Sequence, residues 1–120
     1  MKNIALIGST GSIGRQVLNV CRRHKDKFNI VSLSAGSNKD LFLEQVKEFK
    51  PKVATLGQEI TERVNGTEFF FGDDAFKNAI IKEADIVVVS LVGFKGIIAV
   101  LDAIEKGKNI ALANKESLVV

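Results

Sequence analysis

The sequence predicts an α/β protein in which a mainly parallel sheet is covered by helices on both faces. Short apolar runs alternate along the chain with segments of helical period, and the connections between them are short. This order is typical of parallel strands joined by crossover helices. The 120 residues, 46% hydrophobic and 26% charged, are in the usual range for one domain with one hydrophobic core.

Apolar and alternating runs predict the strands. The first run, Ile4 to Ile7, has the near-continuous apolar character of a strand buried on both faces, and Asp85 to Leu91 has the strongest strand pattern of the chain. We expect strands at residues 4–7, 28–35, 53–56, 67–71, 85–91 and 109–113.

Helical periodicity predicts a helix after each strand. In the second helix, Asn38 or Asp40 is the expected cap, and Pro51 follows the end. The first helix is expected after Gly8, with an apolar side made of Ile13, Val17, Leu18, Val20 and Cys21. Further helices are expected at residues 58–64, at residues 73–81 and from Asn114 onward. Another is expected after Gly93–Gly96, with Ile97, Ile98, Leu101 and Ile104 on one side.

A glycine-rich loop, Gly8-Ser9-Thr10-Gly11-Ser12-Ile13-Gly14, joins the first strand to the first helix. Glycines allow a sharp turn and a close approach of backbone to a diphosphate, and the helix N-terminus supplies free N–H groups. A tight structural turn is the simpler interpretation. The position within a βαβ unit favours dinucleotide binding, and therefore a Rossmann-type, doubly wound sheet. Ile13-Gly14 stands where an NTPase would carry Lys-Ser/Thr, which disfavours a P-loop.

The end of the second strand favours NADPH over NADH. NAD-preferring sites place a carboxylate there, whereas this chain has Ser34-Ala35-Gly36-Ser37-Asn38-Lys39 and no acidic residue before Asp40. Small residues, an amide and a nearby lysine suit a 2′-phosphate. An ordinary polar loop is the alternative.

Two further segments are expected beyond the carboxyl ends of strands, where ligands bind in open α/β sheets. The first is Val92 to Gly96, with glycines that let the nicotinamide half pass close to backbone. The second is Asn114-Lys115-Glu116-Ser117. Asn114 as N-cap and Glu116 in the first turn would be a common helix start, but the Lys115 cation opposes the helix dipole. We therefore interpret Lys115 as a ligand of an anionic or hydroxyl-bearing substrate.

Composition disfavours several other classes of protein. The net charge of +3 comes from scattered residues, which suits a phosphorylated ligand better than a nucleic acid. Cys21 is the only cysteine and is expected in the core, and His24, the only histidine, on the surface. No residues have metal-ligand spacing. The sequence shows no signal peptide and no membrane span, so we expect a cytoplasmic protein.

Three segments together resemble the 1-deoxy-D-xylulose 5-phosphate reductoisomerase family: Gly8 to Gly14, Gly36-x-Asn38, and Ala111-Leu112-Ala113-Asn114-Lys115-Glu116-Ser117-Leu118-Val119, the last being the most specific. The resemblance spans essentially the whole chain. It implies that residues 1–120 are the N-terminal NADPH-binding domain of an enzyme about three times longer. The apolar final residues, Ser117 to Val120, likewise suggest a fragment whose catalytic and C-terminal domains lie downstream.

The family implies an oxidoreductase of isoprenoid biosynthesis. It rearranges a sugar phosphate and reduces it with NADPH to 2-C-methyl-D-erythritol 4-phosphate, using a divalent metal, Mn or Mg. Carried over by position, Thr10, Gly11, Ser12 and Ile13 would hold the cofactor phosphates, and Gly36, Ser37 and Asn38 the adenosine ribose with its 2′-phosphate. Asn114 and Glu116 would contact the cofactor, and Lys115 the substrate. The metal ligands would lie downstream, so we expect no turnover by residues 1–120 alone, and a homodimer at full length.

Two positions depart from the family pattern. Ser37 stands where members often carry a basic residue, so that Lys39 would have to substitute, and Phe94-Lys95 stands where small residues are common. Two other functions are weighed against the reductoisomerase. One is a semialdehyde dehydrogenase-like enzyme, which needs a nucleophilic cysteine that Cys21 cannot supply. The other is a non-catalytic dinucleotide-sensing domain.

Overall fold

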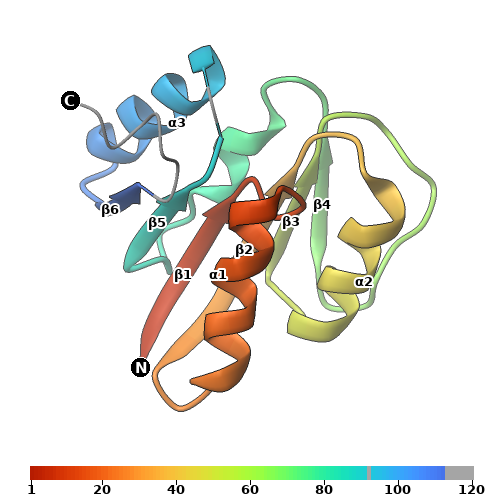
Figure 1. Cartoon of the computed structure of the whole chain (residues 1–120). Helices are drawn as coiled ribbons and strands as arrows, with labels where there is room; N and C mark the ends of the chain where they lie inside the picture. Colours follow the sequence, from red (N-terminus) through yellow and green to blue (C-terminus); the bar gives the residue numbers. More distant parts are fainter. Residues whose placement is uncertain (92, 113–120) are drawn as a thin grey trace.

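The computed structural model describes residues 1–91 and 93–112, which form a layered α/β fold (Figure 1). The strands are Lys2–Ile7 (β1), Phe28–Ala35 (β2), Val53–Leu56 (β3), Glu68–Phe71 (β4), Ile86–Val89 (β5) and Asn109–Leu112 (β6). The helices are Ser12–Arg23 (α1), Lys39–Phe49 (α2) and Gly93–Glu105 (α3), and Ala75–Ala79 form a 3-10 helix (η1).

The strands form one sheet in the order β4-β3-β2-β1-β5-β6, and every neighbouring pair is parallel. β1 lies inside the sheet between β2 and β5, and its residues Ala5, Leu6 and Ile7 are fully buried. The chain thus builds the sheet outward from β1 to β4, then returns to add β5 and β6 on the other side.

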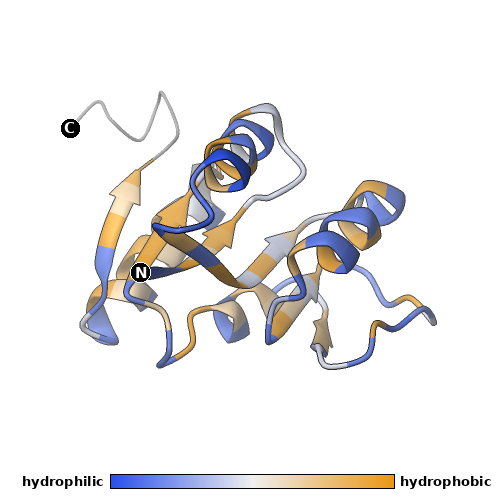
Figure 2. Cartoon of the chain, turned by 90° about the horizontal axis from the view of Figure 1, so that it is seen from below, coloured by the Kyte–Doolittle hydropathy of each residue, from blue (hydrophilic) through white to orange (hydrophobic). Residues whose placement is uncertain are grey.

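Helices cover both faces of the sheet, as Figure 2 shows edge-on. Side chains of a strand alternate between its faces. Leu6 therefore packs with Leu18 of α1 and Phe42 of α2, whereas Ile7 packs on the opposite side with η1 and α3. The predicted class, a doubly wound parallel sheet, is confirmed. Cys21, on the buried side of α1, lies in the core as expected, and burial raises the pKa of its thiol.

The side of α3 that faces the sheet differs from the expected one. Ala99 and Ala103 are fully buried, while Ile97, Leu101 and Ile104 each expose more than half of their surface. Small residues explain this orientation, because they allow the helix to approach the sheet closely. A Cβ at Gly96, for instance, would lie 2.5 Å from the carbonyl oxygen of Leu91.

The predicted helix at residues 58–64 is wrong, because this segment is irregular. It is instead held by its side chains. Ile60 is buried in the core, and the Arg63 guanidinium lies 4.7 Å from the ring centre of Phe71 and 5.5 Å from that of Phe69. Arg63 also donates to the carbonyl oxygen of Ile60 at 2.7 Å. The segment therefore covers the edge strand β4 by contacts that helical periodicity does not encode.

The helix predicted at residues 73–81 is shorter and of a different type. η1 has five residues, and its flanking turns are closed by i→i+3 bonds from Lys77 N to Asp74 O and from Ile80 N to Lys77 O, both 3.2 Å. Stretches this short often adopt the 3-10 form. Phe76 and Ala79 still reach the core, so the segment fulfils the covering role that the pattern indicated.

One glycine contact fixes α1 against the end of β1. A Cβ at Gly14 would lie 2.0 Å from the carbonyl oxygen of Gly8 and 2.9 Å from the Cα of Ser9. No side chain, however small, fits at that distance, and the obstructing atoms are backbone. The first turn of α1 therefore packs directly on the loop that precedes it.

We expect Gly14→Ala to lower the free energy of unfolding by about 3 kcal/mol, because loop and helix must separate to admit a methyl group. Gly11→Ala is the matched control. Its Cβ would lie 3.9 Å from the nearest atom, so this variant should lose less than about 1 kcal/mol of its free energy of unfolding. Urea unfolding of both variants measures the difference. Equal losses would show that the close contact does not constrain the fold.

An ion pair links α1 to α2, in which Arg22 donates to both carboxylate oxygens of Glu48. The hydrogen bond from Arg22 holds the pKa of Glu48 below its ordinary 4.5. A lowered pKa means that the stabilisation is present above pH 4.5 and is lost as the pH falls through the folded-state pKa. Because the pair is partly exposed, we expect Glu48→Gln to cost less than about 1 kcal/mol at pH 7.

The difference between wild type and Glu48→Gln should shrink as the pH is lowered from 5 to 3 in urea unfolding experiments. Glu44→Gln, an exposed position on the same helix, is the control and should leave the profile unchanged. A difference that stays constant across this range would rule out the ion pair as its source.

Candidate functional site

The loop between β1 and α1 lies at the carboxyl edge of the sheet, at the point where the strand order reverses. β1 is flanked by β2, which leads the chain one way, and by β5, which leads it the other way (Figure 1). In open α/β sheets the crevice at this switch point is where ligands bind. The candidate site therefore begins with the glycine loop singled out in the sequence.

The glycines of the loop divide into two kinds. Gly8 has φ +97°, and a Cβ there would lie 2.6 Å from Ser90 Oγ, so Gly8, like Gly14, is required by the fold itself. Gly11 has φ −73° and ψ 170°, which any residue adopts, and its Cβ would meet no atom closer than 3.9 Å. Among the described residues, no atom crowds a Cβ at Gly11, as expected where a ligand must approach the backbone.

The backbone amides of the loop also divide in two. The N–H groups of Gly8 and Ser9 both donate to the carbonyl oxygen of Ser34 in β2, at 2.8 and 2.9 Å. The amides from Thr10 to Gly14 find no acceptor among residues 1–91 and 93–112. The fold thus anchors the start of the loop and leaves the following N–H groups available.

Among residues 1–91 and 93–112, no side chain caps the N-terminus of α1. Gly11 at the N-cap offers no side chain, and the first turn has no acidic residue. α2 is different: its N-terminus has Asp40 in the first turn, and Asn38 Oδ1 accepts from Leu41 N at 3.4 Å. An uncapped helix N-terminus with free amides is suited to an anion.

The second loop, Gly36 to Asn38, follows β2 at the same edge. A Cβ at Gly36 would meet nothing within 4 Å, so this glycine also lacks an internal steric reason. A Cβ at Gly57 would lie 2.7 Å from the Gly36 carbonyl oxygen, and Gly57 N donates to that oxygen at 2.8 Å. The loop is thus supported from the β3 side and open on the other. Asn38 is confirmed as the cap of α2, one of the two candidates the sequence offered.

Lys39, the expected substitute for a basic residue at position 37, already has a partner. Its Nζ lies 2.7 Å from Glu62 Oε2 in an exposed ion pair. The hydrogen bond with Lys39 lowers the pKa of the Glu62 carboxyl to about 2, and the same bond raises the pKa of Lys39. The lysine is therefore charged and adjacent to the loop, but a carboxylate competes for it.

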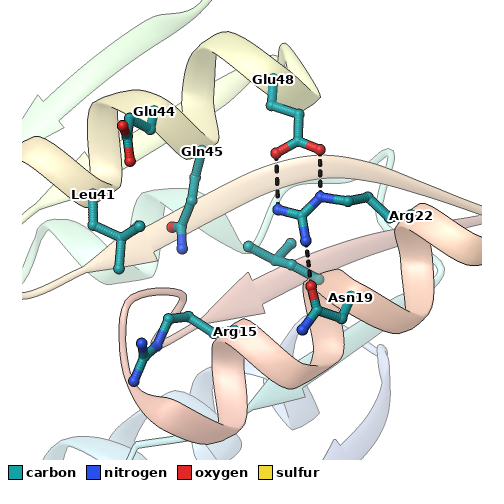
Figure 3. Close-up of a pocket in the computed structure, with 8 residues that line it drawn as sticks. Arg15, Asn19, Arg22, Leu41, Glu44, Gln45 and Glu48 are labelled. Atoms are coloured by element: carbon teal, nitrogen blue, oxygen red, sulfur yellow. Dashed lines mark hydrogen bonds and ion pairs between the residues drawn. The ribbon is translucent and has the colours of Figure 1, made fainter.

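Two cavities flank these loops. A small one of about 50 Å³ at the carboxyl edge is lined by Gly36, Gly57 and Lys95, among others, and Lys95 Nζ lies 3.8 Å from Asp73 Oδ1. A larger one of about 270 Å³ lies between α1 and α2 (Figure 3). The larger cavity extends from the Arg22–Glu48 pair to Arg15 and Leu41, which lie in the first turns of α1 and α2, the helix ends that follow the two loops. We therefore place the candidate site at the loops.

Sequence patterns did not reveal two polar residues that support the site. Ser90, just after β5, has its hydroxyl 2.8 Å from the Gly8 carbonyl oxygen and 3.0 Å from that of Ile7. Gln45 of α2 is buried and donates from Nε2 to the Ser9 carbonyl oxygen at 2.9 Å. A polar residue on the apolar side of a helix, between Phe42 and Val46, was the only signal for Gln45.

The predicted site residues Asn114, Lys115 and Glu116, and also Val92, lie outside the described residues. Among the residues that the structure does describe, no group of three or more His, Cys, Asp or Glu side chains could hold a metal ion. In the same part of the chain, no helix combines the length and apolar character needed to span a bilayer.

Residues 4–120 match the family model of 1-deoxy-D-xylulose 5-phosphate reductoisomerase. The chain is 45% identical over 125 residues to the enzyme of that name from Caldanaerobacter subterraneus subsp. tengcongensis. It is 44% identical over 127 residues to that from Bacillus subtilis. Each alignment covers 99% of this chain and 33% of the relative, so the chain spans about a third of their length.

Solved structures agree with these relatives. The reductoisomerase from Zymomonas mobilis in complex with NADPH superposes with a TM-score of 0.86 at 33% identity, covering 98% of this chain and 33% of that one. A reductoisomerase in complex with NADPH, fosmidomycin and magnesium gives a TM-score of 0.87 at 33% identity, covering 99% and 31%. Sequence, fold and an open glycine loop at the switch point agree: this chain belongs to the 1-deoxy-D-xylulose 5-phosphate reductoisomerase family.

Proposed function

We propose that residues 1–120 are the NADPH-binding domain of a reductoisomerase that converts 1-deoxy-D-xylulose 5-phosphate to 2-C-methyl-D-erythritol 4-phosphate. The observation that carries this proposal is the state of the glycine loop. The amides of Gly8 and Ser9 donate to the Ser34 carbonyl oxygen, while those from Thr10 to Gly14 have no acceptor among the described residues. Gly11, in the middle of these free amides, leaves space for a ligand. The family to which the chain belongs supplies the reaction.

In this proposal the diphosphate of NADPH lies against Thr10, Gly11, Ser12 and Ile13. The N–H groups at the start of α1 donate to its oxygens, and the hydroxyls of Thr10 and Ser12 add further donors. Two relatives of known structure are complexes with NADPH, which supports this choice of ligand. An NTP is disfavoured because no P-loop lysine follows the glycines.

The adenosine ribose and its 2′-phosphate would lie against Gly36, Ser37 and Asn38. Gly36 leaves room for the sugar, and Asn38 uses only its Oδ1 to cap α2, so its amide N–H groups can face a ligand. No carboxylate ends β2 to repel a 2′-phosphate. Lys39, one position further, brings a positive charge to the same loop.

The remaining roles fall on residues beyond the described part and on the rest of the enzyme. Asn114 and Glu116 would contact the cofactor, and Lys115 the sugar phosphate. When bound, NADPH supplies the hydride that reduces the rearranged substrate. The described residues bind and orient the cofactor at the switch point. They offer no ligand set for a metal, so the Mg or Mn ion is assigned to the downstream part of the enzyme.

The match over residues 4–120 favours this function over a semialdehyde dehydrogenase or a dinucleotide-sensing domain. The full-length protein is proposed to be a cytoplasmic homodimer. A single buried cysteine fits a reducing compartment.

The proposed function is tested with the full-length protein, 1-deoxy-D-xylulose 5-phosphate, NADPH and Mn²⁺. We expect NADPH oxidation, and we expect Gly11→Val to raise the KM for NADPH by about tenfold or more, because its branched side chain fills the space assigned to the diphosphate. Circular dichroism of the variant should match the wild type.

Gln16→Val is the control for that experiment, since it places the same side chain on an exposed position of α1. It should leave the KM unchanged. Absence of NADPH oxidation in the wild type would contradict the function, and a normal KM in Gly11→Val would contradict the placement of the diphosphate.

A separate expectation concerns the 2′-phosphate. Lys39→Ala should weaken NADPH binding by about tenfold while leaving NADH binding unchanged, because only NADPH carries the phosphate. Glu62→Gln should act in the opposite direction and strengthen NADPH binding a few-fold, roughly as expected when one exposed ion pair no longer competes.

Isothermal titration with each nucleotide at low and moderate salt measures both effects. Glu59→Gln removes a neighbouring exposed carboxylate that has no ion pair with any described residue, and it controls for net charge. If Lys39→Ala changes NADPH and NADH affinity alike, Lys39 does not contact the 2′-phosphate.

A further inference from the structure

Gln45 is a buried polar residue on the apolar side of α2, and the glycine loop is its one hydrogen-bond partner in the described part of the chain. It is 3% exposed, and its Nε2 donates to the carbonyl oxygen of Ser9 at 2.9 Å. Figure 3 shows the side chain projecting from α2 toward α1, above Arg15. A helix that otherwise buries Phe42, Leu43 and Val46 has no need of an amide here for packing alone.

The bonded atom is informative because a peptide group is planar and trans. The carbonyl oxygen of Ser9 and the N–H of Thr10 belong to one peptide plane and point in opposite directions. When Gln45 holds the Ser9 oxygen inward, toward α2, the Thr10 N–H must point outward. That N–H has no acceptor among the described residues and is the first free amide of the loop.

The other contacts of Ser9 leave the orientation of this peptide to Gln45. The N–H of Ser9 is bonded to the Ser34 carbonyl oxygen, which fixes the preceding peptide plane rather than this one. Ser9 is fully buried, and its hydroxyl has no partner among the described residues. Gln45 Oε1 is likewise buried without a partner in that part of the chain. One amide from a neighbouring helix is thus the contact that sets the direction of the Thr10 donor.

We propose that Gln45 is a positioning residue for the dinucleotide, which acts through the Ser9–Thr10 peptide to aim the Thr10 N–H at the diphosphate. This inference rests on the proposed function, since it assumes that the loop binds the cofactor. Gln45 itself lies behind the loop and does not touch the ligand. Its loss should therefore weaken nucleotide binding while the binding of the sugar phosphate is retained.

The test uses the full-length enzyme and two variants. Gln45→Leu keeps the size of the side chain and removes its donor, and we expect its KM for NADPH to rise about tenfold, the scale of one lost hydrogen bond. Its KM for the sugar phosphate should not change. Gln45→Glu places an acceptor opposite the Ser9 oxygen at neutral pH, and only the protonated carboxyl can donate to that oxygen.

Together with an unchanged KM for the sugar phosphate, Gln45→Glu therefore gives a readout that a general loss of structure would not produce. Relative to wild type, its affinity for NADP⁺ should be low at pH 8 and should recover toward pH 5 as the introduced carboxyl takes up a proton. Arg15 and Arg22 of α1 and Glu44 and Glu48 of α2 line the same cavity. They are present in wild type and in every variant, and the exposed-site controls at Gln16 show whether a charge added elsewhere on α1 gives the same pH dependence.

Gln16→Glu and Gln16→Leu are the matched controls, because they make the same changes on an exposed position of α1. Their affinities relative to wild type should be independent of pH over this range. If wild type fails to bind NADP⁺, the proposed function is wrong. If wild type binds NADP⁺ and both Gln45 variants bind it as tightly as wild type at pH 8, the positioning role alone is wrong. The same holds if the affinity of Gln45→Glu for NADP⁺ does not recover at pH 5.

Discussion

The close contact between α1 and the end of β1 is the constraint on which the rest of the site depends. Gly14 rests on the carbonyl of Gly8 at a distance that excludes any side chain. This contact places the N-terminus of α1 directly over the carboxyl edge of β1. Since β1 is bracketed by β2 and β5, that N-terminus is also at the reversal point of the sheet. Helix dipole, free amides and crevice coincide because of one glycine contact.

Around this contact the loop is held from three sides. β2 contributes the Ser34 carbonyl oxygen, the segment after β5 contributes the Ser90 hydroxyl, and α2 contributes the Gln45 amide. Each of these groups bonds to Gly8 or Ser9, and the amides that follow have no acceptor in the described chain. The rigid and the open halves of the loop thus meet at the Ser9–Thr10 peptide. A preorganised loop loses little conformational entropy when it binds a ligand.

Much of this fold could be predicted from periodicity, because buried parallel strands and amphipathic helices leave clear patterns, as in β1, β2 and α2. The segment at residues 58–64 could not, since Ile60 and Arg63 are held by tertiary contacts rather than by a helical face. α3 shows the same limit, because its small residues rather than its large apolar ones face the sheet. The loop at Gly8 to Gly14 was evident from its glycines, but only coordinates could separate Gly14, required by packing, from Gly11, which is not. Ser90 and Gln45 gave no motif, because single polar side chains that bond to backbone follow no fixed spacing.

The free amides of this loop are proposed to bind the diphosphate of NADPH. A crystal structure of the full-length protein with NADPH tests it most directly. We expect diphosphate oxygens within about 3.2 Å of the amide nitrogens of Thr10 to Ile13, with the Ser9 oxygen still bonded to Gln45. A nucleotide bound elsewhere, with these amides facing only solvent, would contradict it.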